Sequence, residues 1–289
     1  MSSVQSVVFQ LDELSKGQSA IPATGFGAKC VMSPRLELAL DASAEAARLI
    51  LGYYQQSDLA VDLKGDESPV TAADRGAEQL LRDRIAERFP DDGILGEEFG
   101  EHPSGNGWRW ILDPLDGTKS FVHGVPLFGT LIGVESDGRL ELGVCRFPAL
   151  DEVVYAQRGG GTWWGSGSAT PKPATVTGTA KLSDALFCTT TITGWSRLGR
   201  QAAFDRLCRA SGLVRGWSDC YGHILVATGR ADVMVDPEMN VWDAAALIPI
   251  VEEAGGHFVG FNGEASAETG DGVSVNARLL DQVLPLLGD

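Results

Sequence analysis

Asp113 and Asp116 lie three residues apart in the segment DPLDGT, directly after an apolar run of the sequence. The proline and the glycine favour a turn, which can direct both carboxylates toward one point. Carboxylates together with a backbone carbonyl, here that of Leu115, are the oxygen ligands that Mg²⁺ prefers. The amides of Gly117 and Thr118, at the start of a short helix, can bind phosphate oxygens. A solvated surface turn has the same composition, so the function of this segment depends on which other residues reach it.

Further acidic residues stand at the ends of predicted elements. Glu97 and Glu98 follow a short apolar strand, Asp243 opens a helix, and Asp74 stands three residues after Thr71. Each has an ordinary structural explanation. The two glutamates are typical of a solvated loop, Asp243 is typical of a helix N-cap, and the Thr71 pair matches a capping box. A shared metal site would give these acids a chemical role instead.

In this order the residues resemble the signature of the inositol-monophosphatase-like family of metal-dependent phosphatases. The resemblance runs from about Ser33 to the C-terminus and leaves residues 1–32 outside. The motifs that carry it are Lys64-x-Asp66-x-x-Pro69-Val70-Thr71-x-x-Asp74, Gly96-Glu97-Glu98, Trp110-Ile111-Leu112-Asp113-Pro114-Leu115-Asp116-Gly117-Thr118, Trp242-Asp243-Ala244-Ala245 and Glu253-Ala254-Gly255-Gly256.

This resemblance implies a phosphomonoesterase that needs two or three Mg²⁺ ions per active site and works by direct in-line attack of water. It implies that Thr118, hydrogen-bonded to Asp74, orients the attacking water and helps to deprotonate it. It also implies that the amides of Gly117 and Thr118 bind the phosphate. The implied metal ligands, with Asp113 shared between two ions, are Glu97, Asp113, the carbonyl of Leu115, Asp116 and Asp243.

Within the family, Lys119-Ser120-Phe121 and the segments 124–130 and 219–222 look like the histidinol-phosphate phosphatase branch, whereas His123 resembles the inositol branch. We therefore expect hydrolysis of L-histidinol phosphate to L-histidinol and phosphate, a step of histidine biosynthesis. The alternatives are an inositol-1-monophosphatase, or a broad sugar-phosphate or nucleotide 3′,5′-bisphosphate phosphatase. A non-catalytic, ligand-binding relative is the alternative from another class.

Two acids outside the metal set are candidates for substrate binding. Histidinol phosphate carries a cationic amine and a titratable imidazole, so its pocket should place carboxylates away from the metals. Asp236 stands seven residues before Asp243, where family members place an acidic substrate contact. Asp219 stands where inositol enzymes tend to have a small neutral residue. Its alternative role is to cap the helix that follows it.

The apolar pattern predicts the elements that must position these residues. Ser33 and Pro34 predict the start of one helix, and Thr71 predicts the start of a second. Asp137-Gly138 predicts a hairpin, and Pro114 is expected to end its strand at a turn. We expect strands at 94–96, 108–112, 129–135, 140–146, 152–156, 186–191, 231–235 and 257–261, and further helices at 200–211, 219–228, 242–254 and from a cap at Asn276 to Leu287.

These elements predict a layered α/β (α+β) fold with an antiparallel sheet in the first half and a mixed, mostly parallel sheet in the second. The resemblance implies a five-layer α-β-α-β-α sandwich. Residues 1–32 are expected to be a poorly ordered extension. Residues 33–165 are expected to form a subdomain with most metal ligands, and residues 166–289 a subdomain that completes the active site.

Charge and cysteine content narrow the function classes. The chain of 289 residues has 23 basic and 39 acidic residues, a net charge of −16, which argues against nucleic-acid binding. An acidic protein that acts on a phosphate ester needs a cation to offset the repulsion. Five scattered cysteines indicate reduced thiols in the cytoplasm. No secretion signal or membrane span is expected, and the resemblance implies a homodimer whose only other partner is a small phosphomonoester.

Overall fold

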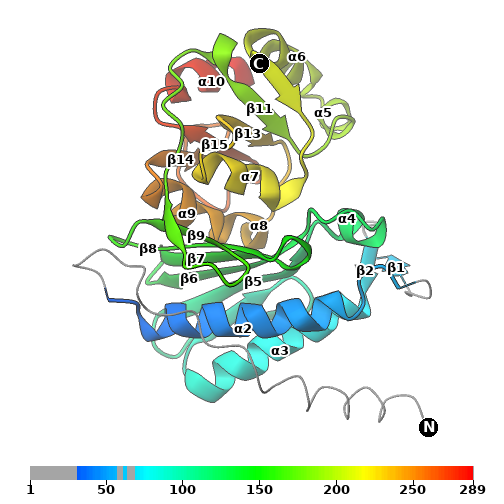
Figure 1. The fold of residues 1–289 in the computed structure, drawn as a ribbon, viewed down its shortest axis with the longest axis vertical. Helices are drawn as coiled ribbons and strands as arrows, with labels where there is room; N and C mark the ends of the chain where they lie inside the picture. Colours follow the sequence, from blue (N-terminus) through cyan, green and yellow to red (C-terminus); the bar gives the residue numbers. More distant parts are fainter. Residues whose placement is uncertain (1–30, 57–60, 64–68, 289) are drawn as a thin grey trace.

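The structure of the protein is a computed structural model that describes residues 31–56, 61–63 and 69–288. The first 30 residues of the expected extension, and Lys64 and Asp66 of the first motif, lie outside the described residues. Five layers follow one another along the long axis of the molecule (Figure 1), helices alternating with sheets. This arrangement confirms the expected sandwich. No helix in the described ranges is long and apolar enough to cross a membrane.

Two helices form the first layer, α2 (Pro34–Leu51) and α3 (Ala72–Arg88). Ser33 caps α2, since its hydroxyl accepts a hydrogen bond from the Leu36 amide, and Pro34 is the first helical residue. Thr71 and Asp74 form the expected capping box of α3. The short ribbon of β1 (Val61–Leu63) and β2 (Pro69–Thr71) leads into α3. Both predicted helix starts are confirmed.

An eight-stranded sheet of the described chain forms the second layer, in the order β10-β9-β8-β7-β6-β5-β3-β4. It is antiparallel except where β3 pairs with β5, so the prediction of a wholly antiparallel sheet was wrong at that pair. The hairpin at Asp137-Gly138 is confirmed. The strands are β3 (Gly93–Gly96), β4 (Gly100–His102), β5 (Trp108–Asp116), β6 (Gly129–Ser136), β7 (Arg139–Phe147), β8 (Glu152–Gln157), β9 (Thr162–Ser166) and β10 (Lys172–Ala174).

Helices α7 (Asp219–Ala227), α8 (Val241–Ala245) and α9 (Leu247–Glu253) lie between the two sheets (Figure 1). The second sheet has the order β12-β11-β13-β15-β14 and is mixed, as predicted. It is not mostly parallel, because β11 pairs in parallel with β12 and β13, whereas β15 pairs antiparallel with β13 and β14. Its strands are β11 (Leu186–Thr189), β12 (Leu213–Arg215), β13 (Val233–Asp236), β14 (Gly256–Val259) and β15 (Gly272–Asn276). The last layer is α5 (Gly194–Arg197), α6 (Gln201–Ala210) and α10 (Leu280–Leu287). The short elements α4 (Thr118–Val122), η1 (Pro148–Leu150) and η2 (Leu182–Asp184) lie in the connections.

Several expected boundaries differ in the structure. The segment 108–112 does not end before Pro114: β5 continues to Asp116, with a bulge between Asp113 and Asp116. The expected helix 242–254 is divided into α8 and α9. Asn276 ends β15, and Leu279 is the N-cap of α10. The change from the first sheet to the second comes after Ala174, whereas the proposed division at 165 and 166 falls inside β9.

Two facing glycines bring α8 and α9 onto the first sheet. Gly133 of β6 pairs with Gly143 of β7. A Cβ at Gly143 would lie 2.0 Å from the carbonyl oxygen of Ala246, and a Cβ at Gly133 would lie 2.8 Å from Cβ of Ala245. Because neither position has room for a side chain, the α8–α9 junction lies directly on the sheet. The next residues toward the N-terminus of α8 are thereby held near the end of β5.

Candidate active site

The end of β5 presents Asp113 and Asp116 from a bulge. Pairing with β6 runs to Asp113 opposite Leu131, and resumes only where Asp116 faces Gly129. The carboxylate of Asp113 accepts a hydrogen bond from the Leu115 amide at 3.0 Å. The hydroxyl of Thr130 donates a hydrogen bond to the carbonyl oxygen of Pro114 at 2.9 Å. This bond satisfies a backbone acceptor in the bulge, where the regular pairing with β6 is interrupted. A bulge next to a functional site redirects side chains in this way.

Asp243 approaches the same point from α8. Its carboxylate accepts the Asn240 amide at 2.7 Å, as the third helical residue of a capping box in which Asn240 is the N-cap. The interpretation of Asp243 as the N-cap itself was therefore wrong. The capping bond uses one carboxylate oxygen of Asp243. One oxygen from each of Asp113, Asp116 and Asp243 lies within 4.8 Å of the others.

Burial and like charge make this cluster costly without a cation. Burial raises the pKa of Asp113 well above its ordinary value, and the charges of Glu97 and the other two aspartates raise it further. Burial also raises the pKa of Asp116 well above normal, with added repulsion from Asp219 and Asp243. The pKa of Asp243 is raised by burial too. Clustered carboxylates of this kind are the donor set of a hard divalent cation, so the residues present fit Mg²⁺.

Glu97 follows β3 and faces Asp113 closely enough to hydrogen-bond with its carboxyl. The amide of Glu97 donates to the carbonyl of Leu112 at 3.2 Å, which continues the β3–β5 pairing by one residue. Glu97 therefore lies beside Asp113, whereas among the described residues the group of carboxylates within 4.8 Å of one another consists of Asp113, Asp116 and Asp243. The expected ligand Leu115 is buried in the β5 bulge beside them.

Thr118 and Asp74 form the expected pair. The Thr118 hydroxyl lies 3.3 Å from Oδ1 of Asp74 and 3.0 Å from the carbonyl oxygen of Leu115. The other carboxylate oxygen of Asp74 accepts both the amide and the hydroxyl of Thr71, at 2.7 and 2.6 Å. Asp74 is thus a capping-box residue and also a partner of Thr118. Burial raises the pKa of Asp74, although the hydrogen bonds from Thr71 lower it.

Gly117 joins β5 to α4 in a left-handed conformation, with φ 79°. A Cβ at this position would lie 2.9 Å from the carbonyl oxygen of Leu127 and 3.2 Å from a carboxylate oxygen of Asp219. Glycine is therefore required both by the backbone angle and by the close approach. The turn places Thr118 beside the carbonyl of Leu115 and the carboxylate of Asp74.

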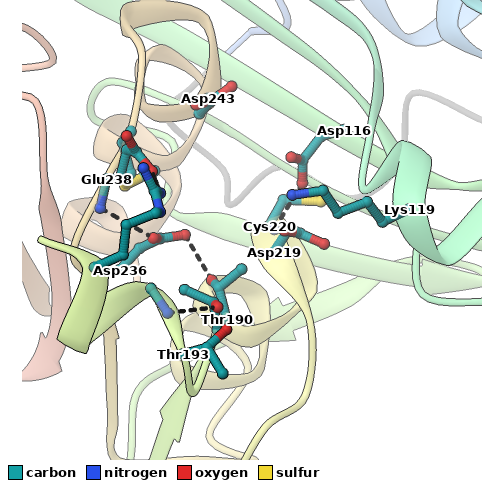
Figure 2. Close-up of a pocket in the computed structure, with 13 residues that line it drawn as sticks. Asp116, Lys119, Thr190, Thr193, Asp219, Cys220, Asp236, Glu238 and Asp243 are labelled. Carbon is teal, nitrogen blue, oxygen red and sulfur yellow. Dashed lines mark hydrogen bonds and ion pairs between the residues drawn. The ribbon is translucent and has the colours of Figure 1, made fainter. Parts of the chain in front are cut away.

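A cavity of about 380 Å³ opens from this cluster (Figure 2). Asp116, Lys119 and Asp219 lie on one side of it, and Asp236, Glu238 and Asp243 on the other. The hydroxyl of Thr190 donates to Asp236 at 2.6 Å. Burial raises the pKa of Asp236 to about 7. Both predicted substrate-contacting acids therefore line the cavity that contains Asp116 and Asp243.

Asp219 does not cap α7. The N-cap is Ser218, at φ 62° and ψ 179°, and its side chain makes no capping bond. Asp219 is the first helical residue and accepts a hydrogen bond from the Ser218 hydroxyl at 2.8 Å. The structure therefore contradicts the interpretation of Asp219 as the helix cap. The next amide, that of Cys220, donates to Asp116 at 2.7 Å and links α7 to the carboxylate cluster.

Several contacts of the site could not be predicted from sequence motifs. The Cys220 amide has no sequence signal, because any residue except proline supplies an amide. Thr190 and Arg197 line the cavity from the segment after β11 and from α5, again with no motif. Glu78 is different, because an acidic residue among the apolar positions of a helix face is a visible anomaly. That carboxylate is fully buried in the structure.

The model of the inositol monophosphatase family matches residues 31–287. A histidinol-phosphatase of Chlorobaculum parvum is 48% identical over 259 residues, which cover 89% of this chain and 98% of that protein. A histidinol-phosphatase of Mycobacterium tuberculosis is 38% identical and covers 87% and 97% of the two chains. The structure of an IMPase from Thermotoga maritima superimposes with a TM-score of 0.79 at 30% identity, covering 88% and 97%. The chain therefore belongs to the inositol monophosphatase family and is a phosphatase.

Proposed function

We propose that the chain hydrolyses L-histidinol phosphate to L-histidinol and inorganic phosphate, using Mg²⁺. The observation that carries this proposal is the position of Asp219 and Asp236 in the same cavity as Asp116 and Asp243. The substrate has an ammonium group that is cationic at neutral pH, and a titratable imidazole. Carboxylates attract such a group and disfavour a neutral polyol. The two similar histidinol-phosphatases support the same substrate.

The metal would be held by Glu97, Asp113, the Leu115 carbonyl, Asp116 and Asp243, as two or three ions. Mg²⁺ bound there supplies charge neutralisation for the phosphoryl group and a more acidic water. Thr118 Oγ1 would orient the attacking water and accept a proton from it, while the hydroxyl proton of Thr118 passes to Asp74 Oδ1, 3.3 Å away. The water oxygen bonds to phosphorus while the ester P–O bond breaks, and the departing alkoxide takes a proton from a solvent water to become the alcohol of histidinol. Asp74 returns the proton that it received to solvent.

Three further features belong to this proposal. We place the enzyme in the cytoplasm, where its described cysteines, Cys145, Cys188, Cys208 and Cys220, remain the free thiols that they are in the structure. We assign the chain from α2 to the end of β10 to a subdomain that carries most of the metal ligands, and the chain after Ala174 to one that completes the site. The assembly is a homodimer, which light scattering of the purified protein tests.

Phosphate release from three substrates tests the substrate assignment. We expect histidinol phosphate to have a kcat/KM at least about 100-fold above those of inositol 1-phosphate and adenosine 3′,5′-bisphosphate, because rejecting a mismatched polar group is worth a few kcal/mol. Comparable values for all three substrates contradict the assignment and indicate a broad phosphatase. No Mg²⁺-dependent release from any of them contradicts the mechanism as well.

Two variants separate substrate recognition from chemistry. Asp219→Asn and Asp236→Asn keep size and shape but remove the charge that attracts the ammonium. Both should raise KM for histidinol phosphate by roughly 10-fold or more, the effect of losing a charge-assisted contact. Inositol 1-phosphate, which lacks the cation, should show little change and serves as the internal control. Equal losses on both substrates would assign these aspartates to the metal site instead.

A further inference from the structure

The turn that carries Glu97 is anchored from α3 by one buried side chain. Glu78 is fully buried. Its Oε2 accepts the amide of Glu98 at 2.7 Å, and its Oε1 accepts the amide of Phe99 at 3.1 Å. These are the two amides that follow Glu97 in the chain. Because both point to one carboxylate, the two peptide planes after Glu97 are held in a single orientation.

Close packing at Gly96 ties the residue before Glu97 to the same carboxylate. A Cβ at Gly96 would lie 2.0 Å from Oε1 of Glu78. Glycine at this position therefore permits the contact, and any side chain would displace the carboxylate or the strand end. Glu97 is thus flanked on both sides by backbone that Glu78 contacts.

An ordinary ion pair does not account for this arrangement. The Arg82 guanidinium donates to Oε1 of Glu78 at 2.8 Å, which accounts for one oxygen. Oε2 makes its hydrogen bond with the turn. Arg82 also donates to the carbonyl of Gly100, so the arginine itself joins α3 to the segment after the turn. Burying a carboxylate is costly, and here the bonds that offset the cost are made largely by the loop that bears Glu97.

The spacing along α3 supports the same conclusion. Asp74 and Glu78 stand four residues apart and lie on one face of the helix. Asp74 contacts Thr118 after β5, while Glu78 contacts the turn after β3. Helix α3 thus reaches two separate loops of the site through two buried carboxylates.

We propose that Glu78 is a positioning residue that holds Glu97 in the orientation in which it joins Asp113 in binding Mg²⁺. The inference rests on the metal dependence of the proposed function and on no particular substrate. A carboxylate is required because both of its oxygens accept N–H groups. Glutamine offers one oxygen and one NH₂ group, and the NH₂ group would face a donor.

Glu78→Gln tests the proposal through Mg²⁺ binding. We expect the variant to bind Mg²⁺ about 10- to 100-fold more weakly than the wild type, the range for residues that orient metal ligands. Calorimetry without substrate measures this affinity, and so does the Mg²⁺ concentration that gives half of the maximal Tm shift. Phosphate release should need correspondingly more Mg²⁺, and kcat should recover to within a few-fold of wild type at saturating Mg²⁺. Glu97→Gln should change Mg²⁺ binding in the same direction.

Arg82→Gln is the matched control. It removes the same ion pair but leaves both amide bonds to Glu78, so it should lower Tm without weakening Mg²⁺ binding. Gly96→Ala displaces the Glu78 carboxylate in a second way and replaces Glu78→Gln if that variant does not fold. The proposal is overturned if the folded variant, Glu78→Gln or Gly96→Ala, binds Mg²⁺ with wild-type affinity. It is also overturned if Arg82→Gln weakens Mg²⁺ binding as much as that variant does. Absence of Mg²⁺ binding in the wild type would instead refute the proposed function.

Discussion

At the residue scale, the site is a set of buried acids that repel one another. One oxygen from each of Asp113, Asp116 and Asp243 lies within 4.8 Å of the others, and burial raises the pKa values of all three. The charge of Asp243 raises the pKa values of Asp113 and Asp116 further, and the charge of Asp219 raises those of Asp116 and Asp243. Hydrogen bonds from Asn240 and Cys220 stabilise the charged forms only in part. A divalent cation reverses the sign of this interaction, and the cluster is explained by metal binding rather than by folding.

Asp243→Asn should separate the contribution of Asp243 to turnover from its effect on the stability of the fold. Removing one charge from the cluster should lower kcat by at least about 1,000-fold, since a metal ligand contributes several kcal/mol to transition-state stabilisation. In EDTA the same variant should unfold at or above the wild-type Tm, because the repulsion is smaller and asparagine still accepts the Asn240 amide. Phosphate release and thermal unfolding measure the two effects. Wild-type turnover would remove Asp243 from the metal site.

Thr118→Ala should act on the chemical step. The hydroxyl lies 3.3 Å from Asp74 and 3.0 Å from the carbonyl oxygen of Leu115. In the mechanism that we propose, this hydroxyl handles the proton of the attacking water. We expect kcat to fall by about 10²- to 10⁴-fold, the usual range for general acid–base groups, with KM nearly unchanged. Thr118→Ser keeps the hydroxyl and is the control. A change confined to KM would assign Thr118 to substrate binding.

For these residues the sequence predicted which side chains lie close together, because their types and spacing form motifs. Asp113, Asp116, Thr118 and Asp243 stand in motifs whose order can be read directly. The Cys220 amide and Glu78 could not be found in the same way. Their roles depend on which backbone lies opposite them, and that is decided by how α7 and the turn after β3 pack.

At the element scale, the least predictable features are the places where chain pairing overrides local preference. Pro114 indicated the end of a strand, but β5 resumes pairing at Asp116 because β6 continues beside it to Gly129. Residues 242–254 have one continuous apolar pattern, yet α8 and α9 separate at Ala246, where the chain lies against Gly143. Both outcomes depend on partners distant in sequence.

Ser218 is a strained residue at an element boundary. Its φ of 62° with ψ of 179° is a conformation that glycine adopts far more readily. The Ser218 hydroxyl lies 2.9 Å from the carbonyl oxygen of Leu127 and 2.8 Å from a carboxylate oxygen of Asp219, two acceptors that share its single proton. It also lies 3.1 Å from the hydroxyl of Ser120, which can donate to it. These bonds hold the start of α7 next to α4. The strain is therefore maintained by contacts of the two segments that form the cavity wall.

Comparison of Ser218→Gly with Ser218→Ala should separate strain from hydrogen bonding. Both lose the hydroxyl, but only glycine relaxes the backbone, so the glycine variant should be more stable by about 1–3 kcal/mol in denaturant unfolding. Both should have lower kcat/KM for histidinol phosphate, because Asp219 and the Cys220 amide lose their anchor. Equal stabilities would show that the backbone at Ser218 is not strained.

At the scale of the whole molecule, the site is assembled from layers. The β5 bulge belongs to the first sheet, α7 and α8 to the middle layer, and Asp236 to the second sheet. The alternation of apolar segments indicated the helices and strands, but the five-layer stacking followed only from the family resemblance. Periodicity says which face of an element is apolar and does not say which partner covers it.

Because both sheets and the helices between them contribute acids to the site, the stability of the metal-free protein should depend on pH. The folded-state pKa values of the cluster acids are raised, and that of Asp236 is raised to about 7. The folded protein therefore binds more protons than the unfolded chain between about pH 4 and 7, so the free energy of unfolding in EDTA should fall as pH rises through that range. For Asp236 alone the loss is at most about 4 kcal/mol, and Asp236→Asn should flatten the profile by that amount.

Mg²⁺ should reverse this dependence, because it competes with protons for the same oxygens. Its stabilisation should grow as pH rises over the same interval and reach about 2.7 kcal/mol when its concentration is 100 times the dissociation constant. Thermal unfolding with EDTA and with Mg²⁺, at several pH values, measures both slopes. Ca²⁺, which takes similar oxygen ligands, and Na⁺ at equal ionic strength are the controls. A Mg²⁺-induced Tm shift that is equal at pH 5 and pH 8, or matched by Na⁺, would mean that the acids of β5 and α8 do not share a cation.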